Sequence, residues 1–424
     1  MKISQKATKI LASKRHRDLF TFFCLYIVQA VPMSFFSTAI PVIMRQENFD
    51  LSTIGMLQLI KLPWIAKFLW APMVDHSCHN ISDYKRWIFL SEIVYAAFIM
   101  MISFFDIHTN FLWIIGLVIA SLITSATQDI ATDSLAIKTF DKSEKGLVNS
   151  MQSMGSFAGT IIGSGVLLIV FKHFGWNMLL PALSLLVLIA LIPLWKNHKL
   201  KFSSESAINK KIRIPFRQNM YGIITFFTQK GIWRQLIFLF FYYSGIIGIL
   251  AMLRPYLVDL GYNLKEIGIM SGIEGTSCAF LTAFAAGIII KKLGRDLSRI
   301  LYATLMLFAT LFFVTFSTFS PSVIHLYIGI FLLWGSYGAA TIVVYTTAMD
   351  NVRPGHEGTD FTIQIVLTHL SAIFVAIGSG KLADIFGYDG LFMMESCLAG
   401  FVLFYTLWAY KIDFLAISKE TINQ

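Results

Sequence analysis

The stretch SLITSATQDIATDSLAIKTFDKSEKGLVNS (121–150) begins as an apolar helix and then places two carboxylates inside that helix. Asp129 and Asp133 lie four residues apart, so both project from one helix face, and Ser121 and Ser125 extend the same stripe. A charge deep in a bilayer costs about 3 kcal/mol or more, so it faces a bundle interior or a wet cavity. The stretch therefore predicts a membrane-embedded helical bundle whose working site lies beside these carboxylates.

The composition of the whole chain supports the same class. Of its 424 residues, 56% are hydrophobic and 14% are charged, whereas a soluble protein carries about 25% charged residues. Apolar runs of about 20 residues recur, and each is long enough to cross a hydrocarbon core about 30 Å thick. These runs lack the strict alternation of a transmembrane β-barrel. We therefore expect an all-α polytopic membrane protein.

The apolar runs predict about twelve transmembrane helices. They lie at 19–43, 51–74, 87–105, 111–138, 147–171, 178–195, 235–258, 266–290, 298–318, 322–349, 359–386 and 389–411. The only long connection, 196–234, separates an N-terminal half (1–195) from a C-terminal half (235–424). Because GSFAGTIIGSG (155–165) resembles SAIFVAIGSG (371–380), we expect two related six-helix halves, the architecture of major facilitator transporters.

Lysine and arginine residues predict the orientation. With both termini in the cytoplasm, cytoplasmic segments contain 27 of the 34 Lys and Arg residues and the opposite segments contain 3. Cytoplasmic loops carry such an excess, so we expect both termini to be cytoplasmic. The net charge of +10 reports this topology and implies no nucleic-acid partner. The basic, aromatic segment 196–234 is either a charged linker or contains an interfacial helix that contacts membrane lipids.

Several function classes are not supported by motifs. The four cysteines are scattered without metal-ligand spacing, and no phosphate-binding loop or recognisable catalytic set occurs. We expect no metal and no cofactor, and we predict a monomeric secondary transporter of a small-molecule solute. An exporter with the same fold and a membrane-embedded enzyme are the alternatives.

Two lysines lie inside the predicted span 51–74. Lys61 is near its middle, where pairing with a carboxylate or an anionic solute is one interpretation and snorkelling is the other. Lys67 is about two turns from the cytoplasmic end, where snorkelling is the simpler interpretation. Pro63 and Pro72 are expected to kink this helix.

Four segments carry a resemblance to a known family. They are QAVPMSFFSTAIP (29–41), KLPWIAKFLWAPMVD (61–75), QDIATDSLAIKTFDKSEKGLVNSMQSMG (128–155) and GTDFTIQ (358–364). Together they resemble the AmpG-like permeases, a branch of the major facilitator superfamily. The resemblance implies proton-driven import across a bacterial inner membrane. Known substrates in the family are muropeptides, with a shorter siderophore-permease branch and an acetyl-CoA transporter group as relatives. Muropeptide permeases have additional spans between the halves, so the compact chain favours the shorter branch.

The resemblance also suggests site residues. It implicates Gln128, Asp129 and Asp133 in transport and implies that predicted helices 1, 4, 7 and 10 line the cavity. Candidate proton carriers are Asp129, Asp133 and, as second choice, Glu274. Candidate solute contacts are Tyr26, Gln29, Lys61, Gln128, Arg254, Tyr337, Thr341 and Tyr345. Packing explains the tyrosines nearly as well. Three other ionisable residues within predicted spans are expected to form pairs between helices: Glu92, Lys381 and Glu395.

Charge pairs at cytoplasmic helix ends are expected to gate transport. Asp75 survives from the loop signature of the superfamily, and Lys85 and Arg86 follow after an insertion. The corresponding GIIIKKLGR (287–295) has cations but no aspartate, and Asp350 follows predicted helix 10.

Overall fold

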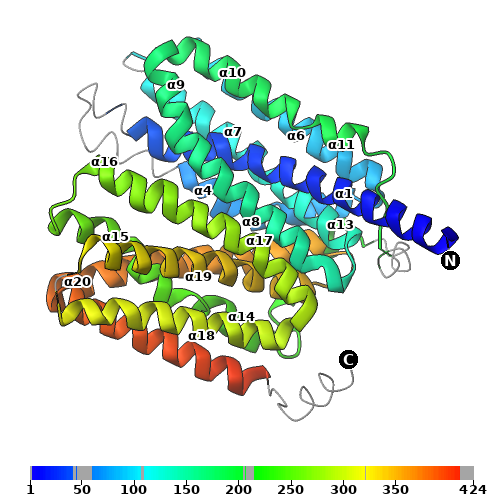
Figure 1. Cartoon of the computed structure of the whole chain (residues 1–424). Helices are drawn as coiled ribbons and strands as arrows, with labels where there is room; N and C mark the ends of the chain where they lie inside the picture. Colours follow the sequence, from blue (N-terminus) through cyan, green and yellow to red (C-terminus); the bar gives the residue numbers. More distant parts are fainter. Residues whose placement is uncertain are drawn as a thin grey trace. The chain divides into compact units, whose positions relative to one another are not determined.

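The structure is a computed structural model, and it describes residues 2–41, 44, 60–106, 109–203, 206, 214–319 and 321–410. Every regular element in these ranges is a helix, which confirms the all-α prediction (Figure 1). Nine helical segments of the described residues are long and apolar enough to cross a membrane. One of them, α20 (Glu357–Tyr410), contains two predicted spans that meet at Gly387, whose φ of 69° favours glycine.

The predicted span 51–74 is described from residue 60 onward. It is divided into α4 (Leu62–Ala66), the short 3₁₀ turn η3 (Lys67–Leu69) and α5 (Ala71–Ser77). Pro63 and Pro72 lie in the first turns of α4 and α5, where a missing backbone N–H is tolerated. The predicted kink is therefore present as a break between two short helices.

Contacts divide the chain into two compact units. The first contains Met1–Gln229 and Ala348–Val366, and the second contains Lys230–Thr347 and Leu367–Gln424. Helices of the first unit are α1 (Lys2–Ser34), α6 (Ile81–Ile102), α7 (Phe111–Thr139), α8 (Lys145–Ile161), α9 (Leu167–Phe174), α10 (Trp176–Ile189), α11 (Ile192–Lys196) and α13 (Phe216–Phe226), besides α4 and α5. Those of the second are α14 (Ile232–Phe241), α15 (Ser244–Asp259), α16 (Leu264–Ile267), α17 (Thr276–Leu293), α18 (Arg295–Val314) and most of α19 (Val323–Asp350) and α20.

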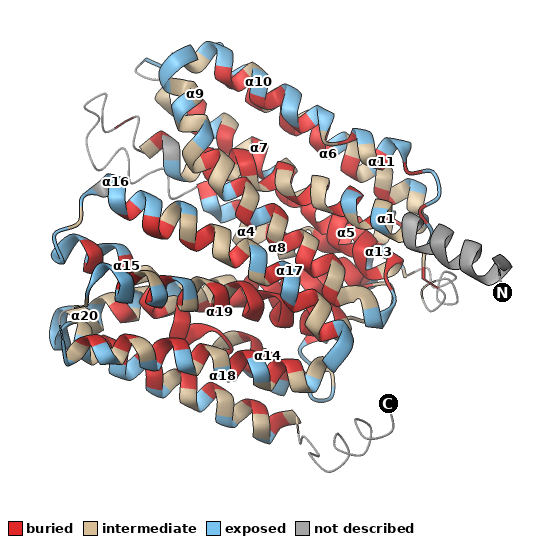
Figure 2. Ribbon diagram, in the orientation of Figure 1, coloured by how far each residue is buried: buried red, intermediate tan, exposed pale blue. Residues whose placement is uncertain are grey.

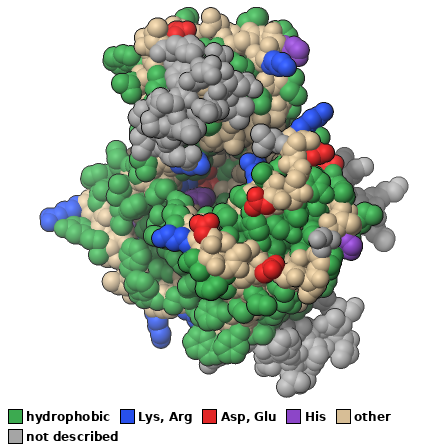
Figure 3. All heavy atoms as spheres, turned by 90° about the vertical axis from the view of Figure 1, so that its left-hand side faces the viewer, with side chains coloured by type: hydrophobic (Ala, Val, Ile, Leu, Met, Phe, Trp, Pro, Cys, Tyr) green, Lys and Arg blue, Asp and Glu red, His purple; other side chains and the backbone are tan. Residues whose placement is uncertain are grey.

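The apolar core of the first unit lies among α1, α6, α7 and α10. Val28, Tyr95, Leu122 and Leu183 are buried there, and burial is concentrated on the faces where helices meet (Figure 2). Outward faces carry large apolar side chains, and Figure 3 shows hydrophobic groups across much of one face. Such apolar surface suits contact with lipid.

Three glycines allow α8 and its continuation to approach α1 closely. A Cβ at Gly155 would lie 2.8 Å from the backbone nitrogen of Ile27, and one at Gly159 would lie 3.0 Å from the carbonyl carbon of Ala30. Gly163 similarly faces α1 at Ser34. This spacing is the small-residue pattern that membrane helices use for close packing. The close packing places α1, seen in dark blue in Figure 1, beside α7, which contains the candidate carboxylates.

Candidate functional site

The carboxylates of α7 are buried and one is paired with a lysine. Asp129 and Lys67 are 3% and 1% exposed, and the Lys67 ammonium donates a hydrogen bond to the Asp129 carboxylate. Lys67 Nζ also lies 4.8 Å from the ring centre of Trp64. Charges removed from water require such a partner, because an unpaired buried charge costs several kcal/mol.

Asp133 lies one turn further along α7 and has neutral partners. Tyr26 Oη donates to Asp133 Oδ1 over 2.8 Å, and Gln152 Nε2 of α8 donates to the same oxygen over 3.2 Å. Beside them, Gln29 of α1 donates to the Gln128 side chain. The structure thus brings together five residues predicted as candidates, Tyr26, Gln29, Gln128, Asp129 and Asp133.

Lys67, Asp129 and Asp133 form what we call the carboxylate cluster. The two carboxylates interact with each other and with Lys67. One lysine neutralises one carboxylate, and two carboxylates in a low-dielectric site do not both stay ionised without further compensation. The cluster therefore contains two buried carboxylates and one lysine, which pairs with Asp129.

The snorkelling interpretation of Lys67 is wrong, because its ammonium lies inside the first unit. Lys61, the lysine expected to be deeper, is exposed at the start of α4. The break at η3 turns the helix so that Lys67, on the following turn, faces α7. Gln152 is not among the predicted site residues. Its sequence signal is that four of the five residues from Asn149 to Ser153 are polar.

A second polar group lies where α5 meets the beginning of α20. The Asp75 carboxylate accepts hydrogen bonds from the backbone N–H groups of Gly358 (2.8 Å) and Thr359 (2.7 Å) and from the Thr359 hydroxyl (2.6 Å). A helix N-terminus offers unpaired N–H groups and a positive dipole end to such an anion. A Cβ at Gly358 would lie 2.8 Å from Asp75 Oδ1, so glycine permits the approach.

Three cations hold the same segment. Lys138 pairs with Glu357 over 3.2 Å, and Lys145 pairs with Asp350 over 3.6 Å. Arg353 contacts Asp360 at 2.6 and 2.8 Å and donates to the Gly222 carbonyl and the Thr225 hydroxyl of α13, both over 2.8 Å. We call the set of residues that fasten the segment 348–360 the latch: Asp75, Lys138, Lys145, Asp350, Arg353, Glu357, Gly358, Thr359 and Asp360.

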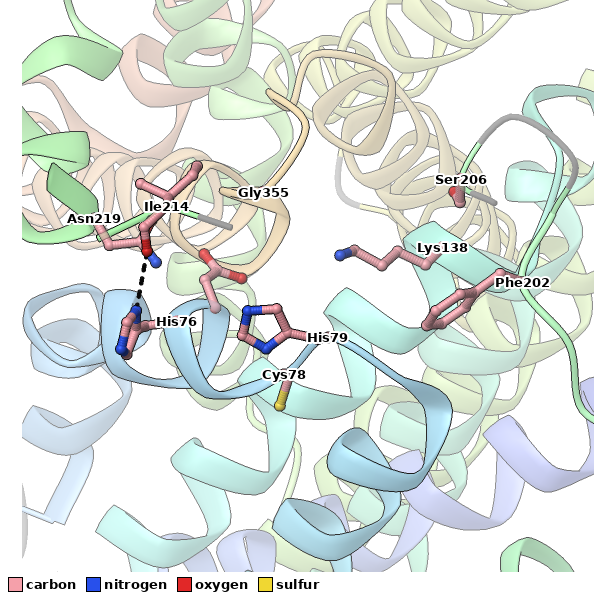
Figure 4. A pocket seen from close by; sticks show the side chains of 10 residues that line it. His76, Cys78, His79, Lys138, Phe202, Ser206, Ile214, Asn219 and Gly355 are labelled. Carbon is pink, nitrogen blue, oxygen red and sulfur yellow. Dashed lines mark hydrogen bonds between the residues drawn. The ribbon is translucent and has the colours of Figure 1, made fainter. Parts of the chain in front are cut away.

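A cavity of about 460 Å³, counted with the solvent space at its mouth, lies beside the latch. Figure 4 shows Lys138, Cys78 and the two histidines around it, with His76 bonded to the Ile214 carbonyl (3.1 Å). Burial and the neighbouring Glu357 carboxylate raise the pKa of Asp75 to about 7, although its three hydrogen bonds oppose the shift. Asp75 is thus a titratable group beside a wet cavity.

The remaining gating candidates lie outside these contacts. Lys85 donates to the carbonyls of Leu194 (3.0 Å) and Asn197 (2.8 Å) and so joins α6 to the end of α11. Arg86 is exposed. Of the predicted gating residues, Asp75 and Asp350 belong to the latch, whereas Lys85 and Arg86 do not.

Candidates in the second unit form a separate group. Tyr337 of α19 packs edge-on against Tyr243 of α15, with ring centres 5.9 Å apart. The Thr341 hydroxyl donates to the Tyr337 carbonyl over 2.8 Å, and Tyr345 is half-buried. Arg254 is exposed, and Glu274 is half-buried.

The two other ionisable residues discussed for the second unit, Glu395 and Lys381, differ in burial. Glu395 is buried and accepts a hydrogen bond from Ser379 over 2.5 Å, which joins the two arms of α20. Lys381 is exposed. The pairing expected of Glu395 is therefore made with a hydroxyl, since no salt bridge to it occurs among the described residues.

Relatives identified by sequence are similar along nearly the whole chain. AmpG 4 of Rickettsia felis, which is named as a transporter, is 24% identical over 417 residues, covering 95% of this chain and 98% of that protein. The anhydromuropeptide permease of Escherichia coli K12 is 21% identical over 389 residues, covering 89% of this chain and 77% of the permease.

Solved structures share the fold. The proton:xylose symporter XylE has a TM-score of 0.67 at 12% identity, over 92% of this chain and 95% of that one. A bacterial homologue of the iron transporter ferroportin, in an outward-facing state, has a TM-score of 0.66 at 14% identity, over 93% of this chain and 99% of that one. The model of the Major Facilitator Superfamily matches residues 22–376. The chain therefore belongs to the major facilitator superfamily, and it is a multi-pass membrane transporter and not an enzyme.

Proposed function

We propose that this secondary transporter is a proton-coupled importer of a medium-sized polar solute, of the muropeptide or siderophore type. The observation that supports coupling is the buried carboxylate cluster, in which one lysine faces two carboxylates. If the cluster binds and releases one proton, its net charge changes while its side chains stay buried beside Tyr26 and Gln152.

Coupling follows from the charge balance. Protonation of Asp129 or Asp133 leaves the cluster neutral, and release of the proton restores a net negative charge that needs water or another cation. Proton and solute drive each other only when both bias the same two-state equilibrium. Asp129, the direct partner of Lys67, is our first choice for the proton carrier, and Glu274 is the second.

The latch is proposed as the cytoplasmic gate. Its charge pairs and the Asp75 contacts hold the start of α20 against the end of α7 and against α13. Breaking them releases that segment. This assignment includes the proposed orientation, in which both termini lie in the cytoplasm of a bacterial inner membrane. Lys85 and Arg86 stay as candidate contributors at a neighbouring helix end.

The solute class rests on the relatives and on the candidate contacts. Names of full-length relatives point to wall-derived glycopeptides, while the closer match in length to AmpG 4 favours a compact branch. Aromatic and hydroxyl groups suit sugar and ring-bearing ligands. In the second unit we propose Tyr337, Thr341, Tyr345 and Arg254 as contacts, and in the first Tyr26, Gln29, Gln128 and Lys61.

Uptake into proteoliposomes tests the proposal. With an inward proton gradient, wild type should accumulate labelled anhydromuropeptide or a ferric siderophore, and Asp129→Asn should abolish accumulation while the matched exposed variant Asp384→Asn does not. Accumulation that is unaffected by Asp129→Asn, or that occurs without a gradient, would contradict proton coupling. Net extrusion from the liposomes under the same gradient would instead establish an exporter.

A further inference from the structure

One buried acid of the first unit lies outside the carboxylate cluster. Glu92 is 0% exposed and lies on the inward face of α6 with Ile88 and Tyr95. Among the described residues, neither carboxyl oxygen of Glu92 has a hydrogen-bond partner, and no salt bridge to Glu92 is formed. The interhelical pairing expected of Glu92 is therefore not formed within the described part of the chain.

An unpaired carboxylate cannot stay charged in such a place. Moving an ion of this size out of water costs several kcal/mol even after relaxation, and a buried group in this situation takes up a proton instead. A buried acid without a partner is therefore expected in its neutral, carboxylic acid form. A glutamine would fill the same space without an ionisable group, so packing alone does not require an acid.

Tyr95 on α6 and Ser125 on α7 each carry a buried hydroxyl group. Tyr95 lies one helical turn from Glu92 on the same buried face of α6. The hydroxyls of Tyr95 and Ser125 are buried, and neither has a hydrogen-bond partner among the described residues, so both are free to form one as side chains rotate. Ser125 precedes Asp129 by one helical turn on α7. The other helix packed on this part of α6, α10, contributes no ionisable side chain between Trp176 and Ile189.

We infer that Glu92 is a second proton-binding residue of the transport cycle, which exchanges its proton with the carboxylate cluster through Tyr95 and Ser125. In the exchange, the Glu92 carboxylic acid becomes a carboxylate as Asp129 or Asp133 becomes a carboxylic acid. Each hydroxyl on the way donates its proton and accepts another. The inference rests on the proposed proton coupling and extends it from one site to two.

A chemical probe tests the protonated acid without any solute. Dicyclohexylcarbodiimide enters apolar surroundings and adds to a protonated carboxyl, whose acyl group then shifts to nitrogen and leaves a stable N-acylurea. Peptide mapping of the wild-type protein in liposomes at neutral pH should find the label on Glu92 and not on the exposed Asp384. An unlabelled Glu92 would overturn the inference, whatever solute the protein carries.

Transport of labelled anhydromuropeptide tests the role in coupling. Glu92→Gln should keep solute counterflow, which needs no gradient, but should lower gradient-driven accumulation by about tenfold, a coupling loss of about 1.4 kcal/mol. Glu92→Asp, which keeps an acid, should retain accumulation. Wild-type accumulation in Glu92→Gln would show that the acid is only a neutral filler.

If Glu92→Gln does not fold, Ser125→Ala provides the test. Slower accumulation with intact counterflow supports the route, and unchanged accumulation contradicts it. If wild type transports no anhydromuropeptide at all, the proposed solute is wrong, and the carbodiimide label still decides the protonation of Glu92.

Discussion

At the scale of single residues, the site depends on a charge imbalance inside a membrane helix bundle. Lys67 and Asp129 compensate each other, and Asp133 accepts hydrogen bonds from Tyr26 and Gln152. The pair is costly to bury and more costly to break, because either partner alone is an uncompensated charge. Substitutions of these residues are therefore expected to affect both stability and the proposed transport.

Removal of one charge should destabilise the protein more than removal of both. Lys67→Met leaves Asp129 unpaired and should lower the free energy of unfolding by about 3–5 kcal/mol. The double variant Lys67→Met/Asp129→Asn should recover most of that loss but not proton-driven uptake. Thermal unfolding in detergent compares the stability of the single and double variants, and the proteoliposome assay measures their uptake. Lys61→Met, which alters an exposed lysine nearby, is the control; an equal loss there would contradict a specific pair.

The pH dependence of the latch follows from Asp75. Its pKa is about 7 in the latched arrangement and about 3.9 when hydrated, so the latched form binds the proton more tightly. Acidification from above pH 7 towards pH 4 should therefore stabilise the latch, and the effect should be lost as pH rises through 7. The titratable and charged groups near the carboxyl are Glu357, Cys78 and Lys138.

Hydrogen exchange checks this dependence. Amides of residues 351–360, corrected for intrinsic exchange, should become more protected as pH falls from 8 to about 6 in wild type. In Asp75→Asn, which cannot titrate, that slope should disappear. A slope of the same size in the variant would assign the effect to His76, His79 or His356 instead.

At the scale of helices, the glycines at 155, 159 and 163 determine how closely α8 and α1 pack. That contact presents Tyr26 and Gln29 to α7. The related run 371–380 does not reproduce it: Gly378 has nothing within 4 Å of an added Cβ, and Gly380 meets only Met252 at 3.8 Å. Two similar sequences thus serve different packing roles, and in the second unit Gly245 and Gly248 make the close contacts, to the backbone and carboxyl of Glu395.

Alanine substitutions should show that a glycine in close helix contact matters and that a glycine with free space around it does not. Gly159→Ala places a methyl against Ala30 and should destabilise the protein by about 1–3 kcal/mol. It should also reduce transport, because Tyr26 moves away from Asp133. Gly165→Ala, where an added Cβ meets nothing within 4 Å, should be neutral. Unfolding midpoints and uptake rates of the two variants provide the comparison, and indistinguishable variants would refute the packing role.

At the scale of the whole molecule, the latch joins parts of the chain that are far apart in sequence. Contacts assign Ala348–Val366 to the first unit, although the predicted boundary places it in the C-terminal half. Under the proposed gating role, breaking a few polar contacts would release this segment from the first unit. The charge distribution predicts on which side of the membrane this happens.

Labelling of single cysteines tests that orientation. In a variant without native cysteines, Lys201→Cys, in the exposed linker, should react with a membrane-impermeant maleimide only in inside-out vesicles. Lys265→Cys, at the exposed start of the α16 segment, should react only in right-side-out vesicles. The reverse pattern would place the latch on the outer side and contradict its role as a cytoplasmic gate.

The sequence alone determined the membrane class, most span positions, the break between 386 and 389, and the buried carboxylates of α7. These follow from local quantities, namely hydropathy, glycine conformation and the cost of a charge in lipid. Tertiary structure decided which lysine faces Asp129, that Gln152 bonds Asp133, that Glu92 has no partner in the described residues, and that Asp75 holds the start of α20. Those contacts join residues up to 284 positions apart, and their geometry depends on helix breaks and glycine contacts that hydropathy does not encode.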